Sequence, residues 1–234
     1  MTNSPTFSYE LATAHIYAHL LYRIHPDQAK RLDREKVAST LKKAVQQANS
    51  LLQNSECNIV VLANPDFVIP EEGIGAMSWG TDWIRIDIDA NNKDLAKNIA
   101  ENLPPAIAHE LHHVARERSV GYGKTLGEVL ITEGLAQAFE EFLYEDRKPL
   151  YAHYLSKKEL ATVWKKAEKN LGSKDFDHNE WFYGSGNLKR WAGYSLGYDI
   201  VSQFLQTNSK HNPVTLVGTS AREIISRSKY NPAA

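Results

Sequence analysis

The stretch His109-Glu110-Leu111-His112-His113 says more about the fold and chemistry of this chain than any other five residues. It is an H-E-x-x-H sequence, in which the two outer histidines are four residues apart. On an α-helix, residues at that spacing lie about 40° apart around the axis and roughly 6 Å apart along it. His109 and His113 can therefore offer imidazole nitrogens to one metal ion, with Glu110 beside them as a base.

Glu133 supplies a third ligand at a suitable distance along the chain. We expect the helix of the two histidines to end near Ser119 and the next helix to begin at Thr125. At a rise of 1.5 Å per residue, the first helix extends roughly 9 Å beyond His113. The second helix extends roughly 12 Å from its start to Glu133. If the two helices pack antiparallel, Glu133 comes back level with the histidines. Its position, twenty residues after His113, is the third-ligand spacing of thermolysin-like zinc peptidases.

Two imidazoles and one carboxylate predict a catalytic rather than a structural zinc site. Such a set leaves the fourth tetrahedral position of Zn²⁺ open for water. The site would keep a net charge of +1, which lowers the pKa of that water. Glu110 would accept the water's proton, and the resulting hydroxide would attack a carbonyl polarised by zinc. We therefore expect one zinc per chain, held by His109, His113 and Glu133.

Other metal signatures fit this stretch less well. The metzincin extension requires glycine and histidine three and six residues past the second histidine, where Arg116 and Ser119 stand. The E-x-x-H of a di-iron bundle occurs only once, and the chain also contains β segments. His112 points about 100° away from His113 on a helix, so we expect it to pack beside the ligands. The remaining alternative is a solvated helix face that happens to carry three histidines.

Hydrophobic periodicity predicts an α+β fold that is mostly helical. Apolar residues recur at three and four positions over residues 9–23 and 27–52, which predicts two helices separated by Pro26. The expected strands, with a hairpin turn at 80–82 between the last two, are 59–63, 74–79 and 83–88. A helix is expected to begin at Pro104-Pro105, and two more are expected to begin at the capping pairs Thr125/Glu128 and Ser156/Glu159. Two further helices are expected over residues 188–205 and 220–228. Residues 171–187 are predicted to form a loop. We interpret residues 1–234 as one domain, with an N-terminal lobe containing the sheet (about 1–119) and a helical C-terminal lobe (about 120–234).

Composition excludes several classes of partner. The 234 residues carry a net charge of -1, which gives no electrostatic footprint for nucleic acid or an anionic membrane. The start of the chain is polar, and no run approaches the ~18 apolar residues of a membrane span. Cys57 is the single cysteine, and its apolar surroundings predict a small buried thiol. These features predict a cytoplasmic protein without nucleic-acid or membrane partners. The metal-binding pattern, in turn, predicts a peptide or protein substrate. The sequence predicts no oligomeric state.

Several segments between residues 108 and 198 resemble a bacterial family of predicted zinc-dependent proteases, the YjaZ-like group. The matching segments are His109-Glu110-Leu111-His112-His113, Thr132-Glu133-Gly134-Leu135-Ala136, Trp181-Phe182-Tyr183-Gly184-Ser185 and Trp191-Ala192-Gly193-Tyr194-Ser195-Leu196-Gly197-Tyr198. The resemblance implies a zincin-like metallopeptidase fold of the gluzincin type, with zinc on His109, His113 and Glu133. It brings no substrate with it. The zinc peptidases that the chain resembles bind a substrate backbone along a sheet edge beside the active-site helix. We therefore expect residues 74–79 to be that edge, with Gly73 and Gly75 allowing close approach.

The last of these segments contains a candidate hydrogen-bond donor for the reaction. Tyr194 and Tyr198 are four residues apart on an expected helix and so share a face. A phenol near the metal can donate to a tetrahedral oxyanion, and we choose Tyr194 for this role. His178, Tyr183 and Tyr198 are rival donors, and aromatic packing is the alternative for either tyrosine of the helix.

Two further patterns imitate functional motifs. Gly193-Tyr194-Ser195-Leu196-Gly197 matches the G-x-S-x-G nucleophile elbow, but no strand pattern precedes it and only His211 follows it. His15 and His19 are also four residues apart, yet no acid follows His15 and no third ligand is evident. We interpret them as paired histidines on a helix face.

The hypothesis that follows is a zinc-dependent metallopeptidase in which Glu110 is the general base and Tyr194 the oxyanion donor. Two alternatives stay open at this point. One is a zincin-fold protein that binds a peptide or partner without cleaving it, although such a protein has no chemical need for Glu110. The other is a zinc hydrolase that acts on a non-peptide amide. Endopeptidase and exopeptidase action are not distinguished by the sequence.

Overall fold

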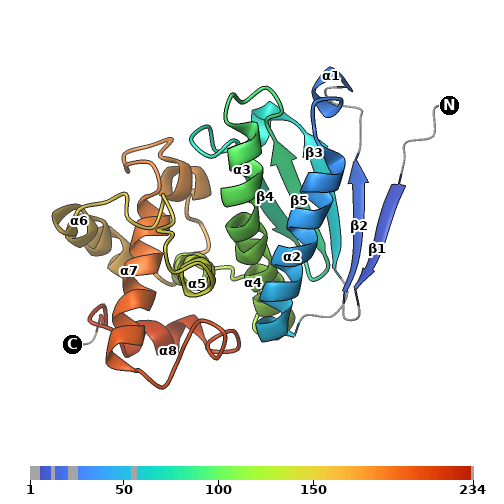
Figure 1. The fold of residues 1–234 in the computed structure, drawn as a ribbon. Coiled ribbons are helices and arrows are strands. Elements are labelled where there is room, and N and C mark those ends of the chain that lie inside the picture. The colour runs from blue at the N-terminus through green and yellow to red at the C-terminus, as the bar shows by residue number, and fades with distance from the viewer. Residues whose placement is uncertain (1–5, 12–13, 21–25, 54–56, 233–234) are drawn as a thin grey trace. The chain divides into compact units, whose positions relative to one another are not determined.

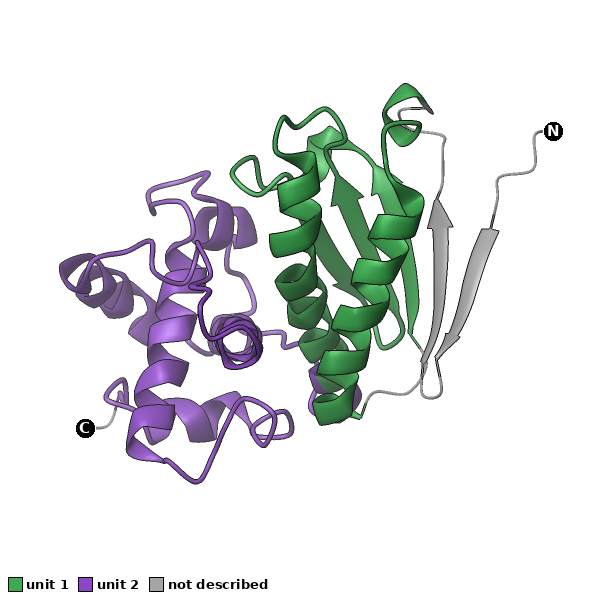
Figure 2. Cartoon of the chain, in the orientation of Figure 1, with its two compact units in different colours: residues 1–115 green, residues 116–234 purple. Residues whose placement is uncertain are grey.

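The structure is a computed structural model that describes residues 6–11, 14–20, 26–53 and 57–232. It has a mixed α+β fold (Figure 1). The contacts within the chain divide it into two compact units, Met1–Ala115 and Arg116–Ala234, which Figure 2 shows in different colours. The boundary falls inside helix α4 (Leu103–Ser119), which is continuous across it.

The first unit contains a five-stranded sheet with the strand order β1-β2-β3-β5-β4. The strands are β1 (Thr6–Leu11), β2 (Ala14–Leu20), β3 (Asn58–Ala63), β4 (Ile74–Trp79) and β5 (Trp83–Ile88). The neighbours β2, β3 and β5 run parallel, while β1 and β4 pair antiparallel at the two edges. The three strands predicted between residues 59 and 88 are therefore confirmed, as is the turn at Gly80, whose φ is 59°.

The helix predicted over residues 9–23 is wrong for residues 9–11 and 14–20, which belong to strands β1 and β2. Residues 12–13 and 21–23 lie outside the described residues. The strands pair from Thr6 with His19 to Leu11 with Ala14. Apolar residues at three and four positions also fit a period of two here, and pairing with the sheet decides between the two periods. His15 and His19 consequently lie on a strand, and the interpretation of them as a helix-face pair is wrong as well.

Helices α2 (Arg34–Leu52), α3 (Leu95–Glu101) and α4 cover one face of this sheet (Figure 1). A short helix, α1 (Pro26–Ala29), and the helix α2 occupy the region where one helix over 27–52 was predicted. The side chain of Asp33 accepts a hydrogen bond from the N–H of Lys36 and so begins α2. The isoleucines of β5 are buried. Cys57 is buried as well, which confirms the prediction for that thiol.

The second unit is helical. Its elements are α5 (Leu126–Leu143), α6 (Lys157–Ala167), the 3₁₀ turn η2 (Glu168–Asn170), the π-helical turn η3 (Asn179–Tyr183), α7 (Ala192–Thr207) and α8 (Ala221–Ser226). The predicted capping boxes of Thr125 with Glu128 and of Ser156 with Glu159 begin α5 and α6. Helix α7 starts later than the predicted residue 188, because Trp191 adopts a left-handed conformation with φ 61° and ends the preceding turn.

Helices α5 and α7 cross closely because both carry glycine at the crossing. A Cβ atom on Gly134 would lie 2.2 Å from the carbonyl oxygen of Gly197, and one on Gly197 would lie 2.1 Å from that of Leu130. No real Cβ makes so short a contact, so any side chain here would force the helices apart. This crossing holds residues 130–134 of α5, which include Glu133, against α7 at Gly197.

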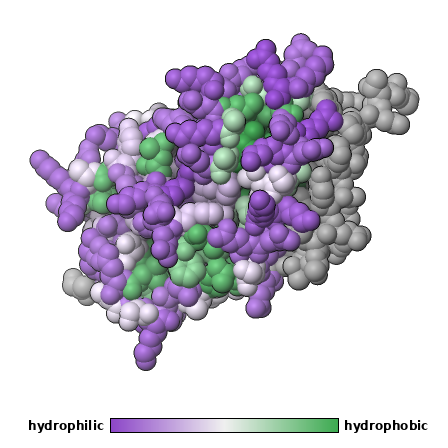
Figure 3. Space-filling model, in the orientation of Figure 1, coloured by the Kyte–Doolittle hydropathy of each residue, from purple (hydrophilic) through white to green (hydrophobic). Residues whose placement is uncertain are grey.

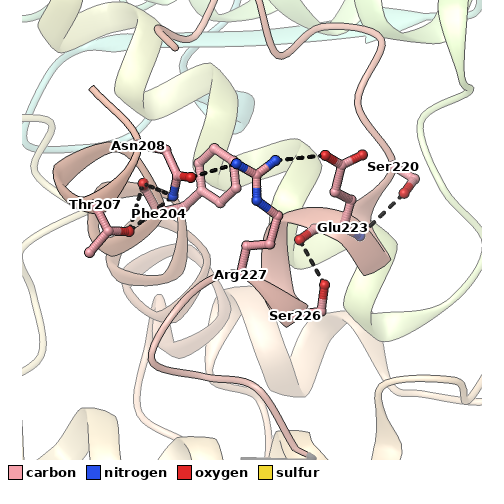
Figure 4. A network of polar contacts seen from close by, with 7 residues as sticks. All are labelled: Phe204, Thr207, Asn208, Ser220, Glu223, Ser226 and Arg227. Atoms are coloured by element: carbon pink, nitrogen blue, oxygen red, sulfur yellow. Dashed lines mark hydrogen bonds and ion pairs between the residues drawn. The ribbon is translucent and has the colours of Figure 1, made fainter. Parts of the chain in front are cut away.

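The C-terminal end of α7 is joined to α8 by a polar network around Arg227 (Figure 4). Its guanidinium donates one hydrogen bond to Glu223, at 2.8 Å, and another to the side chain of Asn208, at 2.5 Å. The guanidinium also lies 5.0 Å from the centre of the Phe204 ring. Ser220 accepts a hydrogen bond from the N–H of Glu223 and so begins α8. Arg227 thereby holds a helix of only six residues against the longer α7.

Hydrophilic residues cover most of the face of the molecule drawn in Figure 3, and the apolar areas on it are small and separate. Among the described residues, no helix is both long and apolar enough to cross a membrane.

Candidate metal centre

Helix α4 carries the H-E-x-x-H residues on a well-anchored stretch. The helix begins at Leu103, so Pro104 and Pro105 lie in its first turn, where their missing N–H groups cost no helical hydrogen bond. The apolar side chains between and around the motif residues are fully buried and anchor the helix; they are Ile107, Leu111 and Val114. The motif residues therefore have a fixed backbone.

The two histidines and Glu133 come together as predicted. The side chains of His109 and His113 are buried, and their ring centres lie 4.5 Å apart with the planes nearly perpendicular. Glu133 is buried on α5. One ligand atom from each of the three residues lies within 4.8 Å of the ligand atoms of the other two. His112 is also buried but does not belong to this group.

The chemistry of this donor set suits zinc. Imidazole nitrogen and carboxylate oxygen bind Zn²⁺ at about 2.0–2.2 Å, which places tetrahedral ligand atoms roughly 3.4 Å from one another. That separation lies within the upper limit of 4.8 Å observed for these three residues. The three side chains together carry one negative charge, so a bound dication would remain partly uncompensated. Glu110 lies next to His109 and is buried, in a position to act beside a bound ion.

Glu133 is held by residues that the sequence interpretation did not identify. The phenol of Tyr122 donates a hydrogen bond to Oε1 of Glu133. Gln137 lies one turn after Glu133 on α5. Its side-chain amide donates hydrogen bonds to the carbonyl oxygens of Glu133 and Tyr194, both at 3.2 Å. Gln137 therefore ties the backbone of the third ligand to α7. The flanking glycines of Tyr122, Gly121 and Gly123, both with positive φ, were the sequence feature that could have drawn attention to this loop.

Arg116 is a buried cation at the end of α4. Its Nε donates 2.9 Å to the hydroxyl of Thr132, the residue before Glu133. Its terminal nitrogen donates to the carbonyl oxygens of Val217 and Thr219, at 2.9 and 3.0 Å. Burial lowers the pKa of the Arg116 guanidinium to about 10, so the group stays charged at neutral pH. The carbonyl oxygens thus accept hydrogen bonds that the buried guanidinium would otherwise donate to water.

The candidate oxyanion donors differ in their surroundings. Tyr194 is half-buried on α7, and its pKa is raised well above the ordinary value by burial and then by the charge of Glu133. The pKa of His178 is lowered by burial, which the charges of Glu133 and Asp177 partly offset. Both groups therefore lie near enough to Glu133 to interact with its charge. Tyr198, in contrast, donates its hydroxyl to Glu141, and Tyr183 is 54% exposed.

Phe182 lies between the two donors that interact with Glu133. Its ring stacks on His178 at 4.6 Å between centres and meets the edge of Tyr194 at 5.0 Å. Phe182 belongs to the π-helical turn Asn179–Tyr183, inside the segment that was predicted as a loop. Such turns are rare, and they occur frequently at functional sites. The sequence does not reveal this turn, because a single turn of five residues is too short to show a hydrophobic period.

Ser195 is not placed as a nucleophile. It lies within α7 rather than after a strand, and it is fully buried. Its hydroxyl donates 2.7 Å to the carbonyl oxygen of Tyr151. The glycines on either side serve packing, since Gly197 contacts α5 and a Cβ on Gly193 would lie 2.7 Å from the Phe182 ring. The G-x-S-x-G pattern here is therefore structural, as expected from the sequence.

Comparison with known proteins gives one family match. A family model described as predicted Zn-dependent protease (DUF2268) matches residues 37–226. No curated protein matches the chain. Among solved structures, the chain is similar to an aminopeptidase N family protein from Idiomarina loihiensis, with a TM-score of 0.49 and 12% sequence identity. That similarity covers 97% of this chain, which spans 42% of the length of the other.

Proposed function

The chain belongs to the family of predicted Zn-dependent proteases (DUF2268), and we propose that it is a zinc metallopeptidase of the gluzincin type with a zincin-like fold. The observation that carries this proposal is the convergence of His109, His113 and Glu133, whose ligand atoms lie within 4.8 Å of one another. Two neutral imidazoles and one carboxylate leave a ligand position of zinc open, as catalytic rather than structural sites do.

Each residue of the centre has a defined task in this proposal. His109, His113 and Glu133 hold one zinc ion per chain. When bound, zinc supplies a Lewis acid for the scissile carbonyl and lowers the pKa of an attacking water. Glu110 takes the proton of that water onto its carboxylate and passes it to the nitrogen of the departing amine. Burial of Glu110 removes competing bulk water from the proton transfer.

Tyr194 donates a hydrogen bond to the oxyanion in this proposal. Its raised pKa keeps the phenol protonated over the whole physiological pH range, which is the state that a donor requires. Gln137 bonds the backbone of Glu133 to that of Tyr194 and so links the ligand to the donor. His178 is the alternative donor, because it also interacts with Glu133 and shares the Phe182 contact.

We expect Tyr194→Phe to lower kcat by about 10²–10³-fold while zinc content stays unchanged, as removal of one oxyanion donor does in other hydrolases. Tyr198→Phe is the matched control, since it removes a phenol from the same helix whose hydroxyl bonds to Glu141 instead. Both variants are compared with the natural chain by steady-state peptide hydrolysis and metal analysis. Equal activities for Tyr194→Phe and the natural chain would move the role to His178.

The proposed position of the substrate backbone is the outer edge of β4. Predicted from sequence to be an edge strand, Ile74–Trp79 pairs with β5 on one side only, and β4 is the last strand of the sheet. The carbonyl oxygen of Ile74 accepts from the N–H of Ile69, so this residue's backbone points away from β5. Because the direction alternates along a strand, Ala76 and Ser78 present their N–H and C=O groups outward. An extended peptide can pair with these groups.

Gly75 allows the close approach of a neighbouring segment of the chain rather than that of a substrate. A Cβ on Gly75 would lie 1.8 Å from the carbonyl oxygen of Phe67. The close approach that glycine allows here is therefore to the chain's own 65–69 segment, and the expectation that Gly75 admits a substrate is wrong. Gly73 has a φ of 63° and forms the turn before β4. The free edge is limited to Ala76 and the residues after it.

We expect Ser78→Pro to raise KM for peptides by about 2–10-fold, because it removes one outward N–H worth about 0.5–1.5 kcal/mol. Proline at an outward-facing edge position leaves the β4–β5 ladder intact. Met77→Pro, whose N–H points toward β5, should instead lower the melting temperature. Peptide hydrolysis and thermal unfolding are measured on both variants. An unchanged KM for Ser78→Pro would show that substrate does not bind along this edge.

The proposed function is tested by incubating the zinc-loaded chain with a peptide library and identifying the fragments by mass spectrometry. We expect cleavage by the natural chain and none by His113→Ala, which lacks a ligand. Binding of peptides without any fragment would favour the non-cleaving zincin-fold alternative. Cleavage of small amides without cleavage of peptides would favour the alternative of a non-peptide amidase.

A further inference from the structure

The carboxylate of Glu133, the third ligand of the proposed zinc site, accepts a hydrogen bond from a loop residue. Tyr122 lies between α4 and α5, and its phenol donates to Oε1 of Glu133. Glu133 itself is buried, so its carboxylate has little water to bond with. A carboxylate with one oxygen occupied by a fixed donor cannot rotate freely, and it presents its other oxygen, Oε2, in one direction.

Tyr122 is in turn held by hydrogen bonds to its backbone. Its N–H donates to the carboxylate of Glu117, on the last turn of α4. Its carbonyl oxygen accepts from the hydroxyl of Thr132 at 2.6 Å. Both backbone groups of this loop residue are therefore fixed to the two helices that flank the loop. The phenol accordingly reaches Glu133 from a fixed starting point rather than from a free surface loop.

Thr132 transmits the restraint to the protein interior. Its hydroxyl accepts from Nε of Arg116 at 2.9 Å while it donates to Tyr122, so its two hydrogen bonds define its rotamer. Arg116 is buried and its terminal nitrogen bonds to the carbonyl oxygens of Val217 and Thr219. The chain of contacts from the 217–219 segment to Glu133 is thus continuous, and every link joins residues of the second unit.

We propose that Tyr122 is a positioning residue for the zinc ligand Glu133: its hydroxyl occupies Oε1 and orients Oε2 toward the metal. The inference rests on the proposed function, because it assigns Tyr122 to that metal site. Partners that hydrogen-bond a metal ligand fix its orientation, and their removal typically weakens metal binding by about 10–100-fold. Nothing in this role requires Tyr122 to contact substrate.

The test compares the zinc dissociation constants of the natural chain and Tyr122→Phe, measured by competition with a chromophoric chelator. The substitution keeps the ring and removes only the hydroxyl. We expect binding to weaken by about 10–100-fold. Thr132→Val, which removes the hydroxyl that fixes the carbonyl of Tyr122, should weaken binding in the same direction, and Thr132→Ser should not. Thermal unfolding of the metal-free variants verifies that each is folded.

Tyr230→Phe is the matched control, because it also removes a phenol that donates to a carboxylate, that of Asp199. It should leave zinc affinity unchanged. Equal zinc affinities for Tyr122→Phe and the natural chain would overturn the inference while leaving the proposed function intact. A loss of kcat in Tyr122→Phe with unchanged zinc affinity would also overturn it, by making Tyr122 a catalytic residue. A natural chain that binds no zinc would overturn both.

Discussion

Glu110→Gln is expected to retain zinc and fold while losing most peptide hydrolysis. The substitution keeps the size and polarity of the side chain but removes the group that accepts the proton of the attacking water. Removal of a general base typically costs about 10²–10⁴-fold, and the loss is larger where the same group also protonates the leaving amine. Glu110 is buried beside His109, and the amide of a glutamine there is not basic enough to take up the proton. Turnover, zinc content and melting temperature are measured together.

The control for this prediction is Glu168→Gln, an exposed acid at the end of α6 that should leave turnover unchanged. Undiminished turnover in Glu110→Gln would contradict the mechanism. Loss of zinc from the same variant would show that Glu110 is a ligand rather than a base. A lowered melting temperature with normal zinc content would assign the side chain a packing role.

Glu133→Ala is expected to lower zinc affinity by more than about 10²-fold, since even the partners of metal ligands contribute about 10–100-fold. The variant keeps both histidines but has no carboxylate to complete the site. Zinc content after dialysis against a weak chelator is the measurement. Replacement of either histidine by alanine should have the same effect.

Glu140→Ala provides a matched control on the same helix. Glu140 is as buried as Glu133, lies seven residues later and accepts a hydrogen bond from the hydroxyl of Tyr151 at 2.8 Å. Its loss should lower stability but leave zinc binding intact, because it is outside the ligand group. Full zinc retention in Glu133→Ala would mean that another residue is the third ligand, with His112 and His178 the next candidates.

Elements that depend on local residues were predictable from the sequence. The capping boxes at Thr125 and Ser156 act within one turn of their helices, and both helices begin where these pairs predict. The residues of β5 alternate with a clear period of two. The β1–β2 hairpin was not predictable, because its residues fit both periods and pairing with β3, about forty residues later, decides its structure.

The residues of the candidate metal site also fall into those that the sequence predicts and those that it does not. His109, His113 and Glu133 follow from helical geometry and the length of one connection, which are local properties. Arg116, in contrast, bonds to Val217, which is 101 residues away in the sequence. Tyr122 reaches Glu133 only because the loop between the helices is held at both of its backbone groups. Contacts of this kind depend on how the chain packs, so no residue spacing predicts them.

The most direct test of the proposed zinc site is a titration of the metal-free chain with zinc, followed by peptide hydrolysis. We expect activity to be absent without metal, to rise linearly with added zinc and to reach a plateau at one zinc per chain. In Glu133→Ala the same additions should restore little activity. Hydrolysis by the metal-free chain in excess chelator, or a plateau unrelated to one zinc per chain, would contradict the proposed zinc mechanism.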